Sequence, residues 1–360
     1  MAHAHRLRAP VRGAAKALLV APAWVGDAVM AHALIRVLAA EHVDQALEVV
    51  APPSTAPLFE RMAEVGAVHR LDVRHGELGL RARRRLGRVL ASAGFEVAYV
   101  LPNSWKSALL PVFARVRRRI GFVGELRYGL LTDARRLDVK ALPRMVDRFV
   151  ALARPAAAAA LEDVPPPRLQ RDVAAARALR GALGLEGTGP VLACAPGAEF
   201  GAAKRWPAEH FAMLAARHAA RGGSVWLFGS SADTSVTARV LAAVPAPYRP
   251  AVHDLAGRTR LLEALDLLGE VDALVSNDSG LLHVACALER PVVALYGSTS
   301  PRFTPPLGAR ARSLSLELPC APCFERECPF GHLRCLRDLS PDRVFAAVEA
   351  FIEARPACVS

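Results

Sequence analysis

Short apolar runs alternate with longer segments of helical periodicity along most of the chain, and the alternation occurs in two rounds. Short runs of β-branched and aliphatic residues predict buried strands, and the segments between them predict helices. Strands that alternate with helices form parallel sheets covered on both faces, because each crossover lays a helix on the sheet. In the first round the predicted strands are 16–21, 46–51 and 97–101, and the predicted helices are 27–40, 55–64 and 78–93.

The second round gives a clearer pattern than the first. Its predicted strands are 191–195, 224–229, 273–277 and 291–296, with a short extended piece at 253–255. Between the rounds, residues 152–170 contain an alanine run and then Val-Pro-Pro-Pro, which is typical of a linker. We therefore predict an α/β protein with two Rossmann-like domains that face each other across a cleft. The predicted divisions are 1–160, 170–340 and a C-terminal segment 341–360 that contains an amphipathic helix at 341–354.

The length and composition agree with two domains, and the charge limits the classes of binding partner. A length of 360 residues is enough for two domains with separate cores, and 52% hydrophobic with 22% charged residues indicates a globular chain. The net charge of +12 suits nucleic acid, an anionic membrane surface or a phosphorylated substrate. Because no basic stretch is interleaved with aromatic residues, we expect no nucleic-acid partner.

The N-terminus mimics a signal peptide, since several basic residues precede an apolar run at 17–25. Pro22 interrupts this run, and Gly26, Asp27 and a helical pattern follow it at once. The run therefore predicts a first buried strand behind a basic leader. No apolar run approaches the roughly 20 residues that a transmembrane helix needs. We expect a cytoplasmic protein that is peripheral at the inner face of the cytoplasmic membrane.

Residues 196–207 (PGAEFGAAKRWP) form the first candidate binding site. A predicted strand leads into a loop of small residues that carries Lys204, and Pro207 stands where a helix should begin. Backbone N–H groups and the helix dipole favour an anion there, and the lysine would neutralise a phosphate. Only four of the 46 basic residues are lysine. A lysine kept in so arginine-rich a chain indicates a need for a compact point charge.

A second loop, 276–283 (SNDSGLLH), has the same arrangement of strand, polar loop and helix start. Asp278 ends the strand, Ser279 is placed to cap the helix, and Gly280 opens it. His283 follows one turn later on the same helix face, which suggests a role toward the ligand. A structural histidine is the alternative.

Two further carboxylates follow predicted strands, where open α/β sheets bind their ligands. Asp27 opens the helix at 27–40, and Asp233 follows a glycine turn after the strand at 224–229. Either side chain can simply cap its helix. Alternatively, Asp27 accepts a proton from a substrate hydroxyl, and Asp233 holds ribose hydroxyls.

Motifs that the sequence lacks narrow the chemistry. Neither half has a G-x-G-x-x-G turn, which disfavours a dinucleotide oxidoreductase. The chain also lacks a Walker motif and a D-x-D, so a metal-held diphosphate or triphosphate is not indicated. Two phosphate-type loops with carboxylates beside them fit a nucleotide that carries a second group.

Four of the seven cysteines have the spacing C-x2-C-x4-C-x6-C, with His332 among them. This spacing resembles a metal knuckle, although it is not a pair of CxxC hooks. The candidates for a structural zinc or iron–sulfur site are Cys320, Cys323, Cys328 and Cys335. Reduced thiols in a loop are the alternative. A basic, zinc-bearing binding protein is the rival function that this cluster allows.

Taken together, six motifs resemble the lipopolysaccharide heptosyltransferases of glycosyltransferase family 9. They are 22–27 (PAWVGD), 101–108 (LPNSWKSA), 124–131 (GELRYGLL), 196–207, 277–285 (NDSGLLHVA) and 303–306 (FTPP). The resemblance implies a GT-B fold and an inverting, metal-independent transfer from ADP-L-glycero-D-manno-heptose. The implied acceptor is heptosyl-Kdo-lipid A, whose first heptose receives the second. Transfer of the first heptose or of a later one is the alternative.

The resemblance also implies roles for single residues. Asp27 corresponds to the catalytic base, and Lys204 corresponds to the lysine that binds the diphosphate. Lys106 and Arg127 lie in family motifs of the first domain and are candidates for acceptor contacts. The last helix is expected to cross back to the first domain. The implied donor-binding residues are Asp233, Asp278, Ser279, Gly280 and His283.

Overall fold

The computed structural model describes residues 16–42, 46–74, 76–154, 163–185, 187 and 189–354. The chain divides into two compact units, Met1–Gln170 and Arg171–Ser360, close to the predicted boundary. The basic leader, the alanine run of the predicted linker and Cys358 lie outside the described residues.

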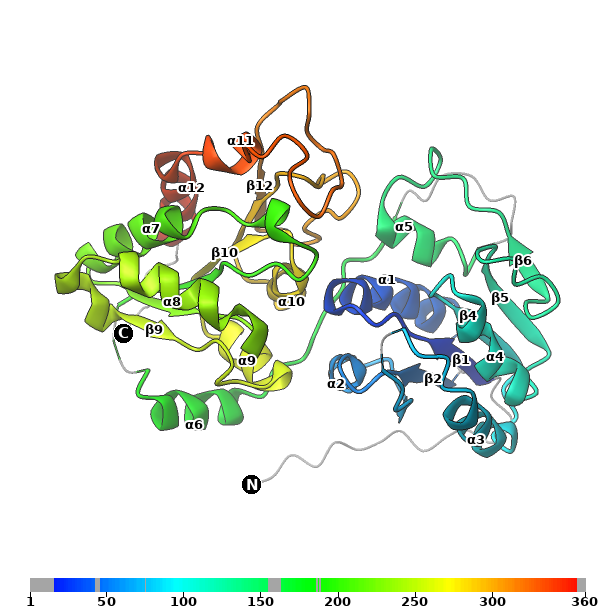
Figure 1. Cartoon of the computed structure of the whole chain (residues 1–360). Helices are drawn as coiled ribbons and strands as arrows, with labels where there is room; N and C mark the ends of the chain where they lie inside the picture. Colours follow the sequence, from blue (N-terminus) through cyan, green and yellow to red (C-terminus); the bar gives the residue numbers. More distant parts are fainter. Residues whose placement is uncertain are drawn as a thin grey trace. The chain divides into compact units, whose positions relative to one another are not determined.

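The first unit contains a six-stranded parallel sheet with the strand order β3-β2-β1-β4-β5-β6 (Figure 1). Helix α1 packs with α2 and α5, and α3 packs with α4. The four successive residues Ala17–Val20 of β1 are all buried, so helices cover both faces of the sheet. The strands are β1 (Lys16–Val20), β2 (Ala46–Ala51), β3 (Ala67–Arg70), β4 (Val97–Val100), β5 (Arg118–Phe122) and β6 (Asp133–Arg135). The helices are α1 (Val25–Glu41), α2 (Ala56–Phe59), α3 (Leu80–Ala91), α4 (Trp105–Phe113) and α5 (Met145–Val150).

The second unit repeats this plan with the strand order β12-β11-β10-β7-β8-β9. Helix α7 packs with α8 and α12, and α9 packs with α6 and α10. The strands are β7 (Val191–Ala195), β8 (Ser224–Leu227), β9 (Val252–Asp254), β10 (Ala273–Asn277), β11 (Val292–Leu295) and β12 (Ala311–Leu314). The helices are α6 (Val173–Leu183), α7 (Ala208–Ala220), α8 (Thr234–Ala243), α9 (Leu261–Leu268), α10 (Gly280–Ala287), α11 (Arg334–Arg337) and α12 (Pro341–Glu353).

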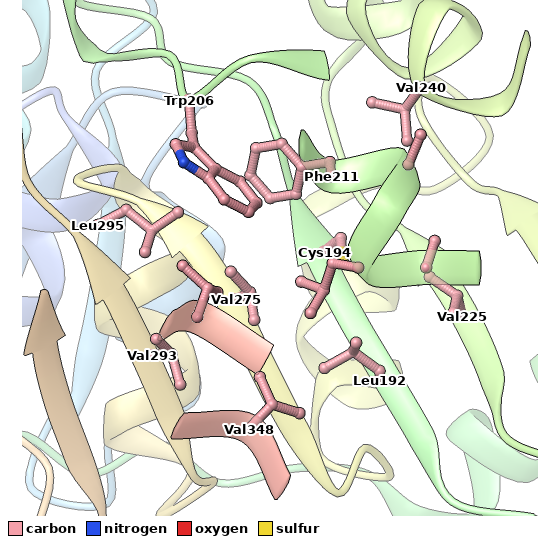
Figure 2. Close-up of a cluster of buried hydrophobic side chains, with 14 of the residues drawn as sticks. Leu192, Cys194, Trp206, Phe211, Val225, Val240, Val275, Val293, Leu295 and Val348 are labelled. Atoms are coloured by element: carbon pink, nitrogen blue, oxygen red, sulfur yellow. The ribbon is translucent and has the colours of Figure 1, made fainter. Parts of the chain in front are cut away.

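The core of the second unit anchors one end of the Lys204 loop, residues 196–207. Figure 2 shows Trp206 at the end of this loop, with its indole among side chains from the sheet and from α7. Trp206 is 1% exposed and meets the Phe211 ring edge-on at 4.9 Å between centroids. Its Nε1 donates a hydrogen bond to the Leu339 carbonyl oxygen at 2.9 Å. The large buried indole therefore fixes where the loop ends and α7 begins.

Helix α12 belongs to the core of the second unit. Its buried side chains Val344, Ala347 and Val348 join the cluster formed by β7, β10, β11 and α7. Ser340 caps the helix by accepting a hydrogen bond from the Arg343 N–H. The predicted segment 341–360 is thus not a separate piece as far as its described residues go. A return of the chain to the first domain stays a prediction.

Each sheet has one place where the order of its strands reverses. In the first sheet this place lies between β1 and β4, and in the second it lies between β7 and β10. Loops that leave neighbouring strands in opposite directions open a crevice there, which is where sheets of this kind bind ligands. The segments that follow these four strands contain most of the residues singled out from the sequence.

Candidate active site

The loops after β7 and β10 bring Lys204 and Asp278 into contact. Lys204 ends a single 3-10 turn, Ala202–Lys204, and Asp278 directly follows β10. The Lys204 Nζ atom lies 2.7 Å from Oδ2 of Asp278 and 3.4 Å from its carbonyl oxygen. Both side chains are largely removed from solvent, at 13% and 4% exposure. The Phe200 ring lies beneath the ammonium, 4.9 Å from Nζ to the ring centroid. The lysine is therefore held in one place before any ligand arrives.

Two threonines that the sequence analysis did not single out complete the partners of Asp278. Thr299 Oγ1 donates to Oδ2 at 2.7 Å, and Thr304 Oγ1 donates to Oδ1 at 3.1 Å. The Tyr296 hydroxyl in turn donates to the Thr304 carbonyl oxygen at 2.6 Å. A buried carboxylate needs such donors because it has lost its hydration. Thr304 belongs to the FTPP motif, so the sequence did contain a feature that could have identified it. Thr299 lies outside all the motifs, and nothing in the sequence indicated its role.

Asn277 ties the Lys204 loop to the end of β10. This residue is fully buried, and its Nδ2 donates to the carbonyl oxygens of Pro196 and Gly197 at 2.8 and 3.3 Å. Its Oδ1 accepts a hydrogen bond from the Trp206 N–H at 3.0 Å. One amide side chain thus holds both ends of the loop. Sequence reasoning missed this role, although Asn277 stands in the NDSG motif.

The N-terminus of α10 lies directly after Asp278. Ser279 occupies the N-cap position, but its side chain makes no capping hydrogen bond and instead meets Ser276 Oγ at 3.0 Å. Ser279 and Gly280 are both partly exposed. Backbone N–H groups at an uncapped helix start attract anions, and the lysine charge is close by. This arrangement suits a phosphate group.

His283 lies inside the protein near this charged pair. Its side chain is 4% exposed, and burial lowers the pKa of the imidazole below its usual value. The Asp278 carboxylate acts to raise that pKa and the Lys204 ammonium acts to lower it, but burial has the larger effect. The ring is therefore neutral at pH 7. A neutral imidazole can accept a hydrogen bond as well as donate one.

This buried histidine predicts a loss of stability in acid. The unfolded chain takes up a proton near the ordinary pKa of 6.5 and the folded chain resists it, so protonation favours unfolding. We expect the free energy of unfolding to fall as the pH drops below about 6.5, by at most about 1.4 kcal/mol per pH unit for this group. Urea titrations at pH 7, 6 and 5 would measure the slope. A His283→Gln variant with an unchanged slope would contradict this assignment.

Asp233 packs against the start of the Lys204 loop. Its carboxylate accepts hydrogen bonds from the N–H and the hydroxyl of Ser230 at 2.9 and 2.8 Å, in a capping box. A Cβ atom built on Gly197 would lie 2.3 Å from Oδ1 of Asp233, so a larger residue fits there only if the Asp233 side chain moves. Asp233 stands at the N-cap position of α8, but its side chain does not cap that helix and serves the preceding 3-10 turn instead. The side chain stands beside the loop that carries Lys204. A contact with the ribose stays a prediction.

In the first unit, Asp27 and Lys106 follow the two strands that flank the reversal point. Asp27 is the third residue of α1, at the end of the segment after β1, and it is partly exposed. Lys106 lies in the first turn of α4, after β4, and its Nζ donates to the Gly76 carbonyl oxygen at 2.7 Å. The same two segments expose Trp24 and Trp105, at 40% and 42%. The sequence analysis did not single out these two indoles.

Arg127 does not have the exposed position that an acceptor contact requires. It is 1% exposed, and burial lowers the pKa of its guanidinium to about 10. The side chain donates to the carbonyl oxygens of Phe122 and Pro102 and to the Asn103 Oδ1. These bonds hold the segments after β4 and β5 together. The guanidinium therefore has a structural role, and its buried position does not support a direct contact with the acceptor.

The four clustered cysteines line one small cavity in the second unit, together with Ser298, His332 and Ala203. All four are free thiols. Among the residues that the structure describes, no three His, Cys, Asp or Glu side chains are arranged as a formed metal site. The loop that carries them meets the Lys204 loop, since the Ala203 N–H donates to the Arg326 carbonyl oxygen at 3.0 Å.

Residues 83–334 match the model of glycosyltransferase family 9 (heptosyltransferase). The match includes both sides of the Lys204–Asp278 pair and the loops that hold it. The chain belongs to this family.

Related proteins match this family 9 chain over nearly its whole length. The lipopolysaccharide heptosyltransferase 2 of Salmonella typhimurium is 41% identical over 342 residues, which cover 94% of this chain and 98% of that protein. The solved structure of the Escherichia coli ADP-heptose LPS heptosyltransferase II has a TM-score of 0.85 and 39% identity, over 94% and 98% of the two chains. The lipopolysaccharide heptosyltransferase 1 of Pseudomonas aeruginosa is 32% identical over 167 residues, 42% of this chain and 45% of that protein.

These comparisons confirm the predicted α/β class, the GT-B architecture and a glycosyltransferase of the heptosyltransferase type. The rival function, a basic zinc-bearing binding protein, has no comparable support. No helix within the described part of the chain is long and apolar enough to cross a membrane.

Proposed function

We propose that this heptosyltransferase transfers L-glycero-D-manno-heptose from its ADP derivative to the first heptose of heptosyl-Kdo-lipid A, with inversion at the anomeric carbon. The observation that carries the donor side is the Lys204 ammonium, pinned by Asp278 beside the uncapped start of α10. The choice of the second heptose rests on relatives named heptosyltransferase 2, which match nearly the whole chain at about 40% identity.

On the donor side, we assign the diphosphate to Lys204 and to the backbone N–H groups at Ser279 and Gly280. The leaving diphosphate gains negative charge as the glycosidic bond breaks. A fixed ammonium and a helix N-terminus stabilise that charge more in the transition state than in the ground state. We assign the nucleoside to Asp233, which lies next to the same loop, and the donor hydroxyls to the neutral His283.

On the acceptor side, we assign the proton transfer to Asp27. A sugar hydroxyl is a poor nucleophile, and a carboxylate that takes its proton as the new bond forms lowers the barrier. Attack from the side opposite the ADP inverts the anomeric carbon. Lys106 and the exposed indoles of Trp24 and Trp105 lie in the same two segments. An ammonium suits the acceptor's phosphates and carboxylates, and flat indoles suit sugar faces.

The assigned steps need no metal, because the lysine and the helix start supply the positive charge at the leaving group. The lipid A part of the acceptor places it in a membrane, so we propose peripheral contact of the first unit with the inner face of the cytoplasmic membrane. The exposed side chains of Leu126 and Tyr128, which lie in the GELRYGLL motif, support that surface.

Release of ADP from ADP-L-glycero-D-manno-heptose tests this proposal. The reaction is run without added metal, with Kdo-lipid A in one series and heptosyl-Kdo-lipid A in another. We expect turnover only with the heptosylated lipid, and no change in rate when Mg²⁺ is added. Turnover only with the bare lipid would make this enzyme the first transferase. Failure with both lipids would overturn the proposal.

A further inference from the structure

The chain from Ser315 to Leu333 contains neither a helix nor a strand. Such long irregular segments are uncommon inside compact domains unless something other than backbone pairing holds them. Leu316, Leu318 and Ala321 are partly buried against the core of the second unit. Farther along the segment, Phe324 and Phe330 are 47% and 66% exposed. We call residues 315–335 the cysteine loop, because four of its side chains are the clustered cysteines.

These four cysteines converge although they are spread along the loop. All of them line a single cavity of about 10 Å³. Cys335 is 8% exposed and the other three are partly buried. The thiols are not paired in disulfides. Three of the sulfurs come from the irregular segment and the fourth comes from α11, which directly follows it. Convergence of four sulfurs close together in the chain is typical of tetrahedral thiolate sites for zinc or iron.

One further feature fits a metal bound by thiolates. The Ser298 hydroxyl lines the same cavity, is 1% exposed and has no hydrogen-bond partner among the residues that the structure describes. A buried hydroxyl normally finds a partner, and a thiolate sulfur beside it would be one.

We propose that Cys320, Cys323, Cys328 and Cys335 bind a single thiophilic metal ion, zinc or iron. The cavity is small, and a single ion suits it. Among the described residues, these side chains do not form a complete metal site. The sulfurs must therefore move toward one another to bind the ion. Cys320, Cys323 and Cys328 lie in a segment without helix or strand, which can adjust toward Cys335 in α11. With four cysteine ligands the ion has no open position, and its role is structural.

The ion would stabilise the surroundings of the Lys204 loop. Ala203 lines the cavity, and its N–H is bonded to Arg326 in the cysteine loop. A Cβ atom on Gly201 would lie 2.3 Å from the Arg326 carbonyl oxygen, so the two loops are in direct contact. The Arg326 guanidinium also lies over the Phe200 ring, at 5.4 Å. Ordering the cysteine loop therefore orders one wall of the Lys204 loop.

Metal content tests this proposal without the transferase reaction. The full chain is purified in buffers free of chelators, and zinc and iron are measured by mass spectrometry of the elements. We expect about one ion per chain, and the element found decides between zinc and iron. We also expect the metal to be lost in Cys328→Ser and Cys335→Ser but retained in Cys286→Ser, whose cysteine is buried in α10 away from the cavity.

A second measurement covers the case in which a cysteine variant fails to fold. The wild-type protein is stripped under reducing conditions and titrated with Co²⁺, which gives intense charge-transfer absorption when four thiolates bind it. The proposal is overturned if the purified chain holds no metal and all its thiols react at once, or if the four cysteines form two disulfides. Either result would leave the proposed transfer reaction untouched.

Discussion

Replacing Lys204 by alanine lowers the rate of heptosyl transfer by roughly 10²–10³-fold, the usual cost of removing one preorganised charge-stabilising group. The ammonium is the cation that the second unit holds in place, through Asp278 and above Phe200. Its loss leaves the departing diphosphate with the N–H groups of α10 alone. We expect kcat to fall more than the affinity for ADP-heptose, because the charge develops mainly in the transition state.

The same substitution also removes the ionic partner of a carboxylate that is 4% exposed. Taking one member from a buried pair costs about 3–5 kcal/mol of unfolding free energy, because the other charge stays buried without compensation. The double variant Lys204→Ala/Asp278→Asn separates the two effects. It should recover much of the stability, since an amide needs no counter-charge, and it should stay as slow as the single variant.

Lys140→Ala is the matched control, because it removes an exposed lysine of the first unit. We expect it to retain both rate and stability. A Lys204→Ala protein that is folded and keeps a rate within tenfold of the wild type would show that the diphosphate is neutralised elsewhere. Steady-state rates and urea titrations are measured on the wild type, Lys204→Ala, Lys204→Ala/Asp278→Asn and Lys140→Ala. Together they separate the loss of rate from the loss of stability.

Replacing Asp27 by asparagine lowers kcat by roughly 10²–10⁴-fold, the range expected for loss of a general base. The amide has nearly the same shape but cannot take up the proton. The wild-type rate should fall in acid as the carboxylate becomes protonated, and the residual rate of the variant should lack that fall. ADP binding, measured by calorimetry, should be unchanged, because the donor residues lie in the second unit.

Glu96→Gln provides the matched carboxylate-to-amide control. Glu96 is exposed and directly precedes β4. It therefore lies at the amino ends of the strands, whereas Asp27 follows the carboxyl end of β1. We expect this variant to keep the wild-type rate and pH profile. If Asp27→Asn kept the acid limb of the profile, the proton would be going to another group and Asp27 would serve only the start of α1.

The central strands could be predicted from the sequence, and the outer ones could not. Strands β2, β7 and β10 lie at the predicted residues, because central strands of a parallel sheet are apolar on both faces. β5 begins with two arginines, and β3 and β12 carry polar residues as well. Their pairing depends on the strands beside them rather than on their own pattern. The exception is β9 (Val252–Asp254), an edge strand that overlaps the extended piece predicted at 253–255.

The candidate site shows a similar division. Lys204 and Asp278 were each identified from their own loops, but their contact depends on β7 lying next to β10. Thr299 reaches Asp278 from the loop after β11, which the sequence pattern does not bring near. Arg127 looks like any surface arginine in a basic chain. Its burial depends on carbonyl groups supplied by two other segments, which only the folded first unit brings together.

The contact between Gly197 and Asp233 has a consequence for the evolution of this enzyme. A side chain at position 197 would overlap the carboxylate of Asp233, which itself holds Ser230 at the start of its helix. Position 197 can therefore take a larger residue only once Asp233 has moved or been replaced, whereas Asp233 can change while the glycine is kept. Substitutions at the two positions should arise in that order, so that two short motifs, well separated along the chain, do not evolve independently.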